Sequence, residues 1–278
     1  LDLELLVAMC VPFRIRACHL FGWWFLCCGV PHAVALSGSL FPLPTVVHFA
    51  PGHARHRSSS ERHPETPARL DEICLPALET AQTLDGHLRW AIRKDGPRAD
   101  AVDAVRRVHD LTYVERVRAA SASVSSKSER SVLSLSRLFA ARRRRDAALG
   151  VDTYASAGTY TALLEAQSLW LDAVDAALSS QSVEAASPLA SSKNERTPSS
   201  SSLVLPCSSS WVLSRPPGHH AGRATADGFC VFNLCAGAAA YALEAYSVDW
   251  VAVVDWDAHH GNGLAAFADT EPRVSYAS

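Results

Sequence analysis

The stretch that decides the fold is WVAVVDWDAHHGNG, residues 250–263. Its first five residues are continuously apolar, as in a strand that is covered on both faces within a parallel sheet. Polar residues and glycines follow directly, so the strand is expected to end at Val254, just before Asp255. In open α/β sheets, ligand sites lie at the carboxyl ends of strands. The stretch therefore predicts a buried strand with a functional site at its end.

Acidic and imidazole side chains alternate after this strand. Asp255, Asp257 and His259 are spaced two residues apart, and such side chains project to one side of extended chain. Two carboxylates and an imidazole converging there are costly unless a cation joins them. Their donor atoms suit zinc or a similar divalent ion. The alternative is that one aspartate caps the following helix and the histidines pack structurally.

A second polar motif, RPPGHHA, spans residues 215–221. Its two histidines, His219 and His220, follow a rigid Pro-Pro-Gly turn, and neighbouring side chains diverge. They are therefore better placed as proton-transfer groups, each oriented by its own partner, than as ligands of one metal. A surface pair and an adventitious metal site are the alternatives. The segment DGFCVFN (227–233) then sets Phe229 beside a glycine, either in the wall of a substrate channel or in ordinary core.

Strand and helix patterns alternate around these motifs. Strands are expected at 44–49, 211–214, 250–254 and 273–278, and helices from Pro67 onward, over 163–178 and over 234–246. This order predicts an α/β fold with an open, mainly parallel sheet flanked by helices.

Two serine-rich stretches interrupt this pattern, at 121–149 and 179–210, and we interpret them as insertions in a domain that covers 44–278. The first contains the run Arg142–Arg145, either a nuclear-localisation signal or a solvated patch. Residues 1–43 are left out of the fold. They resemble a signal or targeting peptide, and an artefact of the gene model is the alternative.

Composition excludes several classes of protein. The net charge is −2, with 48% hydrophobic and 19% charged residues, which indicates a globular core and no basic field for direct nucleic-acid binding. The eight cysteines form no Cys-x-x-Cys pair, so a zinc finger is excluded. The apolar run near the N-terminus breaks at Gly29 and Pro31, so no membrane span is expected.

Together, RPPGHHA, GFCVFN and VDWDAHHGNG resemble the class II-like and acetoin-utilisation-type branch of the histone deacetylase family. Weaker similarity extends upstream through HPETPAR (63–69), the segment 108–114 and the segment 152–160. The resemblance implies an arginase/deacetylase-like fold and zinc-dependent hydrolysis of the acetyl-lysine amide in an acetylated protein, histone or non-histone. Within the same fold, an acetylated polyamine is the alternative substrate.

The resemblance also implies roles for individual residues. The zinc ligands would be Asp257 and His259, and the catalytic groups would be His219, His220, Asp255 and Asn262, with Asp255 orienting His219 and Asn262 facing His220. The substrate-binding residues would be Asp152, Gly228, Phe229 and Arg69. A structural potassium ion would be bound by Asp255, Asp257, the His259 carbonyl and Ser278.

By this resemblance, the family's third zinc ligand and its oxyanion tyrosine would lie beyond Ser278. We therefore expect an N-terminal fragment, with the sheet truncated on its C-terminal side, that is inactive alone. A catalytically dead binding module is the alternative.

An arginase-type two-metal site is disfavoured because His260-Gly261 follows Asp-Ala-His where that site needs an aspartate. A calcineurin-like phosphoesterase would need no Pro-Pro-Gly-His-His motif. Nucleus or cytoplasm is the expected location, or an organelle if the N-terminal segment is a targeting signal.

Overall fold

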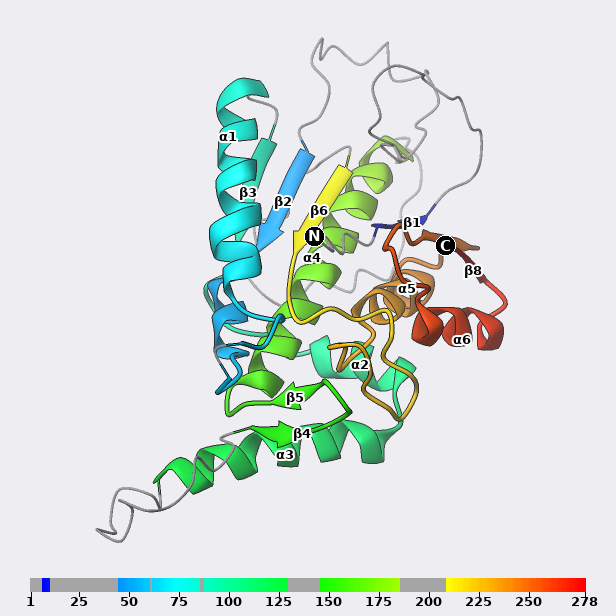
Figure 1. Cartoon of the computed structure of the whole chain (residues 1–278). Helices are drawn as coiled ribbons and strands as arrows, with labels where there is room; N and C mark the ends of the chain where they lie inside the picture. The colour runs from blue at the N-terminus through cyan, green and yellow to red at the C-terminus, as the bar shows by residue number, and fades with distance from the viewer. Residues whose placement is uncertain (1–6, 11–44, 61, 86–87, 130–145, 186–208) are drawn as a thin grey trace, which may run out of the picture.

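The computed structural model describes residues 7–10, 45–60, 62–85, 88–129, 146–185 and 209–278. It confirms an α/β fold whose parallel strands are flanked by helices (Figure 1). The first three-stranded sheet has the order β3 (Leu88–Ile92), β2 (Thr45–Phe49), β6 (Ser209–Leu213). The second has the order β1 (Val7–Cys10), β7 (Val251–Val254), β8 (Val274–Ala277). A ribbon of β4 (Ala147–Ala148) and β5 (Tyr154–Ala155) completes the strands of the described chain.

The first sheet is parallel and covered on both faces. Strand β2 pairs in parallel with β3 and with β6. Val47 and Phe49 pack on the side of Leu70 and helix α1 (Leu75–Asp85), whereas Val46 packs on Ala176 of helix α4 (Thr159–Ala185). The alternation of side chains along a strand therefore places α1 and α4 on opposite faces.

The second sheet carries the strand predicted from 250–254. Strand β7 is parallel to β8 and antiparallel to β1. Val251 and Val253, on one face, are 0% and 1% exposed, whereas Ala252 and Val254 on the other face are only partly buried. Full burial is therefore found on one face of the strand, not on both as predicted. Helix α5 (Leu234–Ala245) precedes β7 and helix α6 (Asn262–Thr270) follows it, so the motifs stand at strand–helix junctions.

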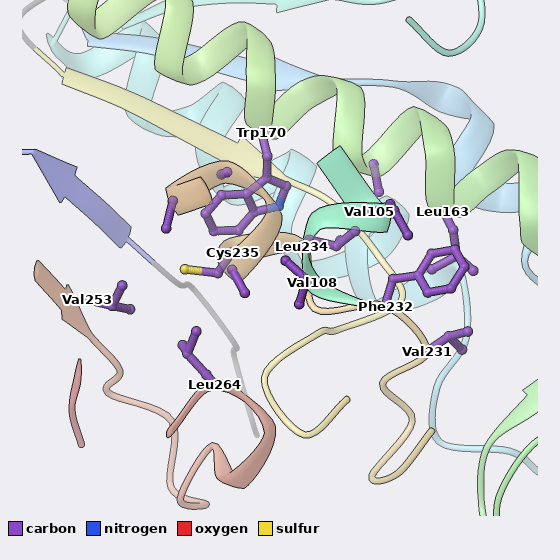
Figure 2. Packing of buried hydrophobic residues seen from close by; sticks show 14 of the residues in the cluster. Val105, Val108, Leu163, Trp170, Val231, Phe232, Leu234, Cys235, Val253 and Leu264 are labelled. Carbon is purple, nitrogen blue, oxygen red and sulfur yellow. The ribbon is translucent and has the colours of Figure 1, made fainter. Parts of the chain in front are cut away.

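One large apolar core joins this second sheet to the helices (Figure 2). Trp170 of α4 lies over Leu234 and Cys235 of α5, and Val253 and Leu264 close the core below them (Figure 2). Helices α2 (Ala101–Val108) and α3 (Leu111–Glu129) pack on the same cluster.

Helices α4 and α5 meet at a glycine. A Cβ at Gly237 of α5 would lie 2.5 Å from Oε1 of the buried Gln167 on α4. The amide of Gln167 donates to the Leu234 carbonyl at 3.2 Å, so this side chain is held in place. A larger residue at Gly237 would therefore separate the two helices.

The helices differ from the predicted pattern at their ends. Helix α3 reaches Glu129 and α4 reaches Ala185, so each enters a predicted serine-rich insertion before ending. Relative to alanine, each serine lowers helix stability by only about 0.5 kcal/mol. A helix anchored in the core can therefore continue into serine-rich sequence. The helix predicted from Pro67 begins instead as a π-helical turn, Arg69–Cys74, which leads into α1.

Several predicted segments lie outside the described residues. These are residues 11–43 with their apolar run, the serine-rich residues 130–145 that contain the arginine run, and residues 186–208. In the parts of the chain that are described, no helix combines the length and apolar character needed to cross a bilayer.

Candidate active site

A cavity of about 630 Å³ brings the predicted motifs together. Its lining joins loops that follow β6 and β7 to the loop before α1. The predicted site residues among those that line it are Arg69, Asp152, His219, His220, Gly228, Phe229, Asp255 and His259. The strand-end location expected from the sequence is therefore where the cavity lies.

His219 and Asp255 form a buried pair between the two motifs. The Nδ1 of His219 lies 2.8 Å from Oδ2 of Asp255, and each side chain is 2% exposed. A carboxylate only accepts hydrogen bonds, so Nδ1 carries the proton and Nε2 is the basic nitrogen. Burial alone would raise the pKa of Asp255, but hydrogen bonds from His219, the Asp257 amide and Tyr276 hold it below its usual value. The pair can therefore accept and return a proton at Nε2.

His220 has its own partner, as its position beside His219 suggests. Its Nδ1 lies 2.7 Å from Oδ1 of Asn262, the first residue of α6. The two imidazole rings stand 4.0 Å apart, centroid to centroid. Behind His220, Gly228 has a φ of +50°, and a Cβ there would lie 2.4 Å from the ring. The absence of a side chain at Gly228 thus leaves the space that the His220 ring occupies.

Asp257 and His259 bring two donor atoms together beside this histidine pair. Oδ1 of Asp257 lies 3.1 Å from Nδ1 of His259, and 4.0 Å from Nε2 of His219. Two ligands about 2.0 Å from one tetrahedral zinc ion lie about 3.3 Å apart, so this spacing fits one ion. Among the described residues, no group of three or more His, Cys, Asp or Glu side chains is arranged to hold a metal. The spacing of the two side chains is thus that expected for two ligands of one ion.

Ser278 lies at the same end of the sheet as Asp255. The Asp255 amide donates to the Ala277 carbonyl at 2.8 Å, which continues the parallel pairing of β7 with β8. The structure therefore brings the termini of both strands together where a potassium ion was expected.

The outer rim of the cavity is held by Thr153. Its hydroxyl donates to Oδ1 of Asp152 at 3.1 Å and accepts the Phe229 amide at 3.0 Å. Phe229 has a φ of +67°, an uncommon conformation for a bulky residue, and its ring packs edge-on against His63 at 5.3 Å. The carboxylate and the aromatic ring predicted to contact substrate are therefore fixed relative to each other.

A buried ion pair supports the cavity from within. Glu65 is fully buried and accepts two hydrogen bonds from Arg215, which directly precedes the Pro-Pro-Gly-His-His motif. Burial alone would raise the pKa of Glu65, but hydrogen bonds from His56 and Arg215 outweigh it and lower the pKa to about 2. Arg69 lies on the same side of the cavity, with Nη1 4.0 Å from Oε1 of Glu65.

Sequence reasoning missed three contributors: Glu65, Thr153 and Tyr276. Each acts through a partner 15 or more residues away, such as Tyr276 on Gly261 or Glu65 on Arg215. No spacing rule links such positions. The only signal was their place inside segments already singled out, 63–69, 152–160 and 273–278.

The fold and this site define an α/β protein with an oriented histidine pair beside a close aspartate–histidine pair. The model of the histone deacetylase domain matches residues 63–278, and the chain belongs to that family. An uncharacterized protein of Synechocystis sp. is 32% identical over 217 residues, which cover 78% of this chain and 55% of that protein. The human polyamine deacetylase HDAC10 is 52% identical over 67 residues, 24% of this chain and 10% of that protein.

Among solved structures, the crystal structure of the HDA15 HD domain aligns with a TM-score of 0.59 and 26% identity. The alignment covers 84% of this chain and 53% of that one. The chain thus spans about half the length of the Synechocystis relative and of this structure.

Proposed function

We propose that this chain provides half of the active site of a zinc-dependent deacetylase, which hydrolyses the acetyl-lysine amide of a protein. One observation carries the proposal. The Asp255–His219 pair directs a basic nitrogen toward Asp257, whose carboxylate lies 3.1 Å from the His259 imidazole. A proton acceptor that lines the cavity, beside two side chains able to donate to a metal, is the combination that metal-assisted amide hydrolysis needs.

Each residue has a defined task in this reaction. Asp257 and His259 would hold zinc, which when bound polarises the amide carbonyl and lowers the pKa of water. His219 takes the proton of the attacking water at Nε2, while Asp255 fixes its ring and stabilises the positive charge that it gains. His220, held by Asn262, returns a proton to the leaving amine. Phe229 walls the channel for the acyl chain, and Asp152 accepts hydrogen bonds from substrate at the rim.

Two parts of the site are proposed to come from outside these residues: a further aspartate ligand for zinc and a tyrosine that binds the oxyanion. This agrees with the share of its relatives that the chain covers. A potassium ion near Asp255 and Ser278 would stabilise the strand ends. The alternative, a catalytically dead binding module, keeps the fold and lacks turnover.

An acetylated polyamine is the second candidate substrate. The observation that favours it is the 52% identity to human polyamine deacetylase HDAC10 within a 67-residue segment. Both substrates present an N-alkyl acetamide group at the end of an alkyl chain, so the same channel suits either.

The test is a deacetylation assay on the zinc-loaded protein encoded by the complete transcript. An acetyl-lysine peptide and an acetylated polyamine are compared by kcat/KM. His219→Ala is expected to lower kcat by about 10²- to 10⁴-fold, the usual contribution of a general base. His260→Ala, at an exposed neighbouring histidine, is the matched control. Absence of turnover with both substrates, in protein that binds zinc, would favour the binding module. Turnover by these 278 residues alone would refute the need for further ligands.

A further inference from the structure

Tyr276 is the one phenol in the described chain whose hydroxyl contacts the buried carboxylate that holds His219. Its side chain comes from β8, where it stands opposite Val253 of β7. The hydroxyl donates to Oδ2 of Asp255 at 3.0 Å and accepts the Gly261 amide at 2.9 Å. It therefore links the end of β7 to the turn that carries His259 and His260.

The Tyr276 hydroxyl contacts the same oxygen of Asp255 that holds His219. Oδ2 of Asp255 also accepts from Nδ1 of His219 at 2.8 Å, while Oδ1 accepts from the Asp257 amide at 3.1 Å. The carboxylate is thus fixed at both oxygens. Rotation about its last bond would break the bond from Tyr276 together with the bond from His219.

Gly261 makes this arrangement sterically feasible. A Cβ at Gly261 would lie 2.5 Å from Oδ2 of Asp255 and 2.9 Å from both Nδ1 of His219 and the Tyr276 hydroxyl. The three polar groups therefore converge against one glycine, and the Gly261 amide supplies the donor that orients the hydroxyl. With its lone pair engaged by Gly261, the hydroxyl points its proton at Asp255.

We propose that Tyr276 is a positioning residue that holds Asp255 in the orientation required to keep His219 protonated at Nδ1 and basic at Nε2. The inference rests on the proposed role of His219 in proton transfer. The hydroxyl, rather than the ring, positions Asp255, because the ring packs against His260, with 5.5 Å between the ring centroids.

The test is NMR spectroscopy of the 278-residue chain labelled with ¹⁵N-histidine. The Nδ1 proton of His219 is assigned by its loss in His219→Gln. In Tyr276→Phe, this resonance is expected to move, and its exchange with water to become about tenfold faster, the effect of losing one hydrogen bond to a charged group. Tyr246→Phe is the matched control, because Tyr246 donates at 2.8 Å to Asp175, a buried carboxylate outside the cavity.

An unchanged His219 resonance and exchange rate in folded Tyr276→Phe would overturn the proposal. If this variant does not fold, the test is made on the unsubstituted chain, by measuring the nuclear Overhauser effect between the His219 Nδ1 proton and the Tyr276 ring. Its presence supports the proposal and its absence overturns it. Since neither readout depends on turnover, loss of the proposed deacetylase function leaves a distinguishable result: an inactive protein in which Tyr276→Phe still moves the His219 signal.

Discussion

Oδ1 of Asp257 lies 3.1 Å from Nδ1 of His259, about the separation of two ligands on one tetrahedral zinc ion. The Asp257 side chain is 3% exposed and that of His259 is 62% exposed, so an ion would have one fixed and one movable ligand. The arrangement predicts which single substitutions weaken metal binding.

Asp257→Ala and His259→Ala are each expected to reduce zinc affinity at least about tenfold, because each removes a direct donor. Calorimetric titration of the chain with zinc measures this. His260→Ala serves as the control, since its ring packs on Tyr276, whereas the imidazoles near the Asp257 carboxylate are those of His219 and His259. Equal affinities in all three variants would show that zinc binds elsewhere.

The space behind His220 is tested by comparing two glycines with positive φ. Gly228 and Gly96 have φ of +50° and +76°, but a Cβ meets the His220 ring only at Gly228, and nothing within 4 Å at Gly96. Gly228→Ala is expected to lower the free energy of unfolding by about 1–3 kcal/mol more than Gly96→Ala, since both carry the backbone cost and one adds the steric clash. Urea denaturation gives both values, and equal losses would mean that His220 moves aside freely.

The Glu65–Arg215 ion pair is expected to be far more important for stability than an exposed pair. Glu65→Gln leaves the Arg215 guanidinium, 3% exposed, without its carboxylate, and should cost about 3–5 kcal/mol. Glu244→Gln removes the 62%-exposed partner of Arg107 and should cost less than about 1 kcal/mol. Chemical denaturation compares the two. A small effect at Glu65 would show that solvent reaches the pair.

His109 predicts a pH dependence of stability. Burial lowers its pKa from 6.5 to about 4, while its Nε2 accepts the Asn233 amide at 2.8 Å. Between these values the unfolded chain binds a proton that the native chain does not, so this stabilisation is complete above pH 6.5 and is lost as pH falls toward 4.

His109→Gln keeps an acceptor but cannot titrate. It should therefore reduce the slope of unfolding free energy against pH in that window by up to about 1.4 kcal/mol per pH unit. Thermal or urea unfolding at several pH values measures the slope. His48, whose pKa is also lowered to about 4, should still contribute in the variant. An unchanged slope would contradict the buried, neutral state of His109.

The parts of the fold that could be predicted are those encoded locally. The apolar run 250–254 became β7, and the histidines of 215–221 met the acidic residues of 255–259 because both motifs follow strands. Helix ends were less predictable, because α3 and α4, once anchored in the core by their earlier turns, continue into serine-rich sequence. The support of Asp255 by Tyr276 depends on the register of β8 against β7, and no pattern within either strand specifies that register.

The close contact of α4 with α5 at Gly237 affects the geometry of the candidate active site as well as the packing of the core. Helix α5 is the crossover between the loop that carries His219 and strand β7, which Asp255 directly follows. The hydrogen bond between His219 and Asp255 allows little change in their distance. A side chain at position 237 would displace this crossover and change the spacing of a histidine and an aspartate that it never touches. Selection on proton transfer would then act on a position deep in the core, so tolerance to substitution at Gly237 should follow the demands of chemistry as much as those of stability.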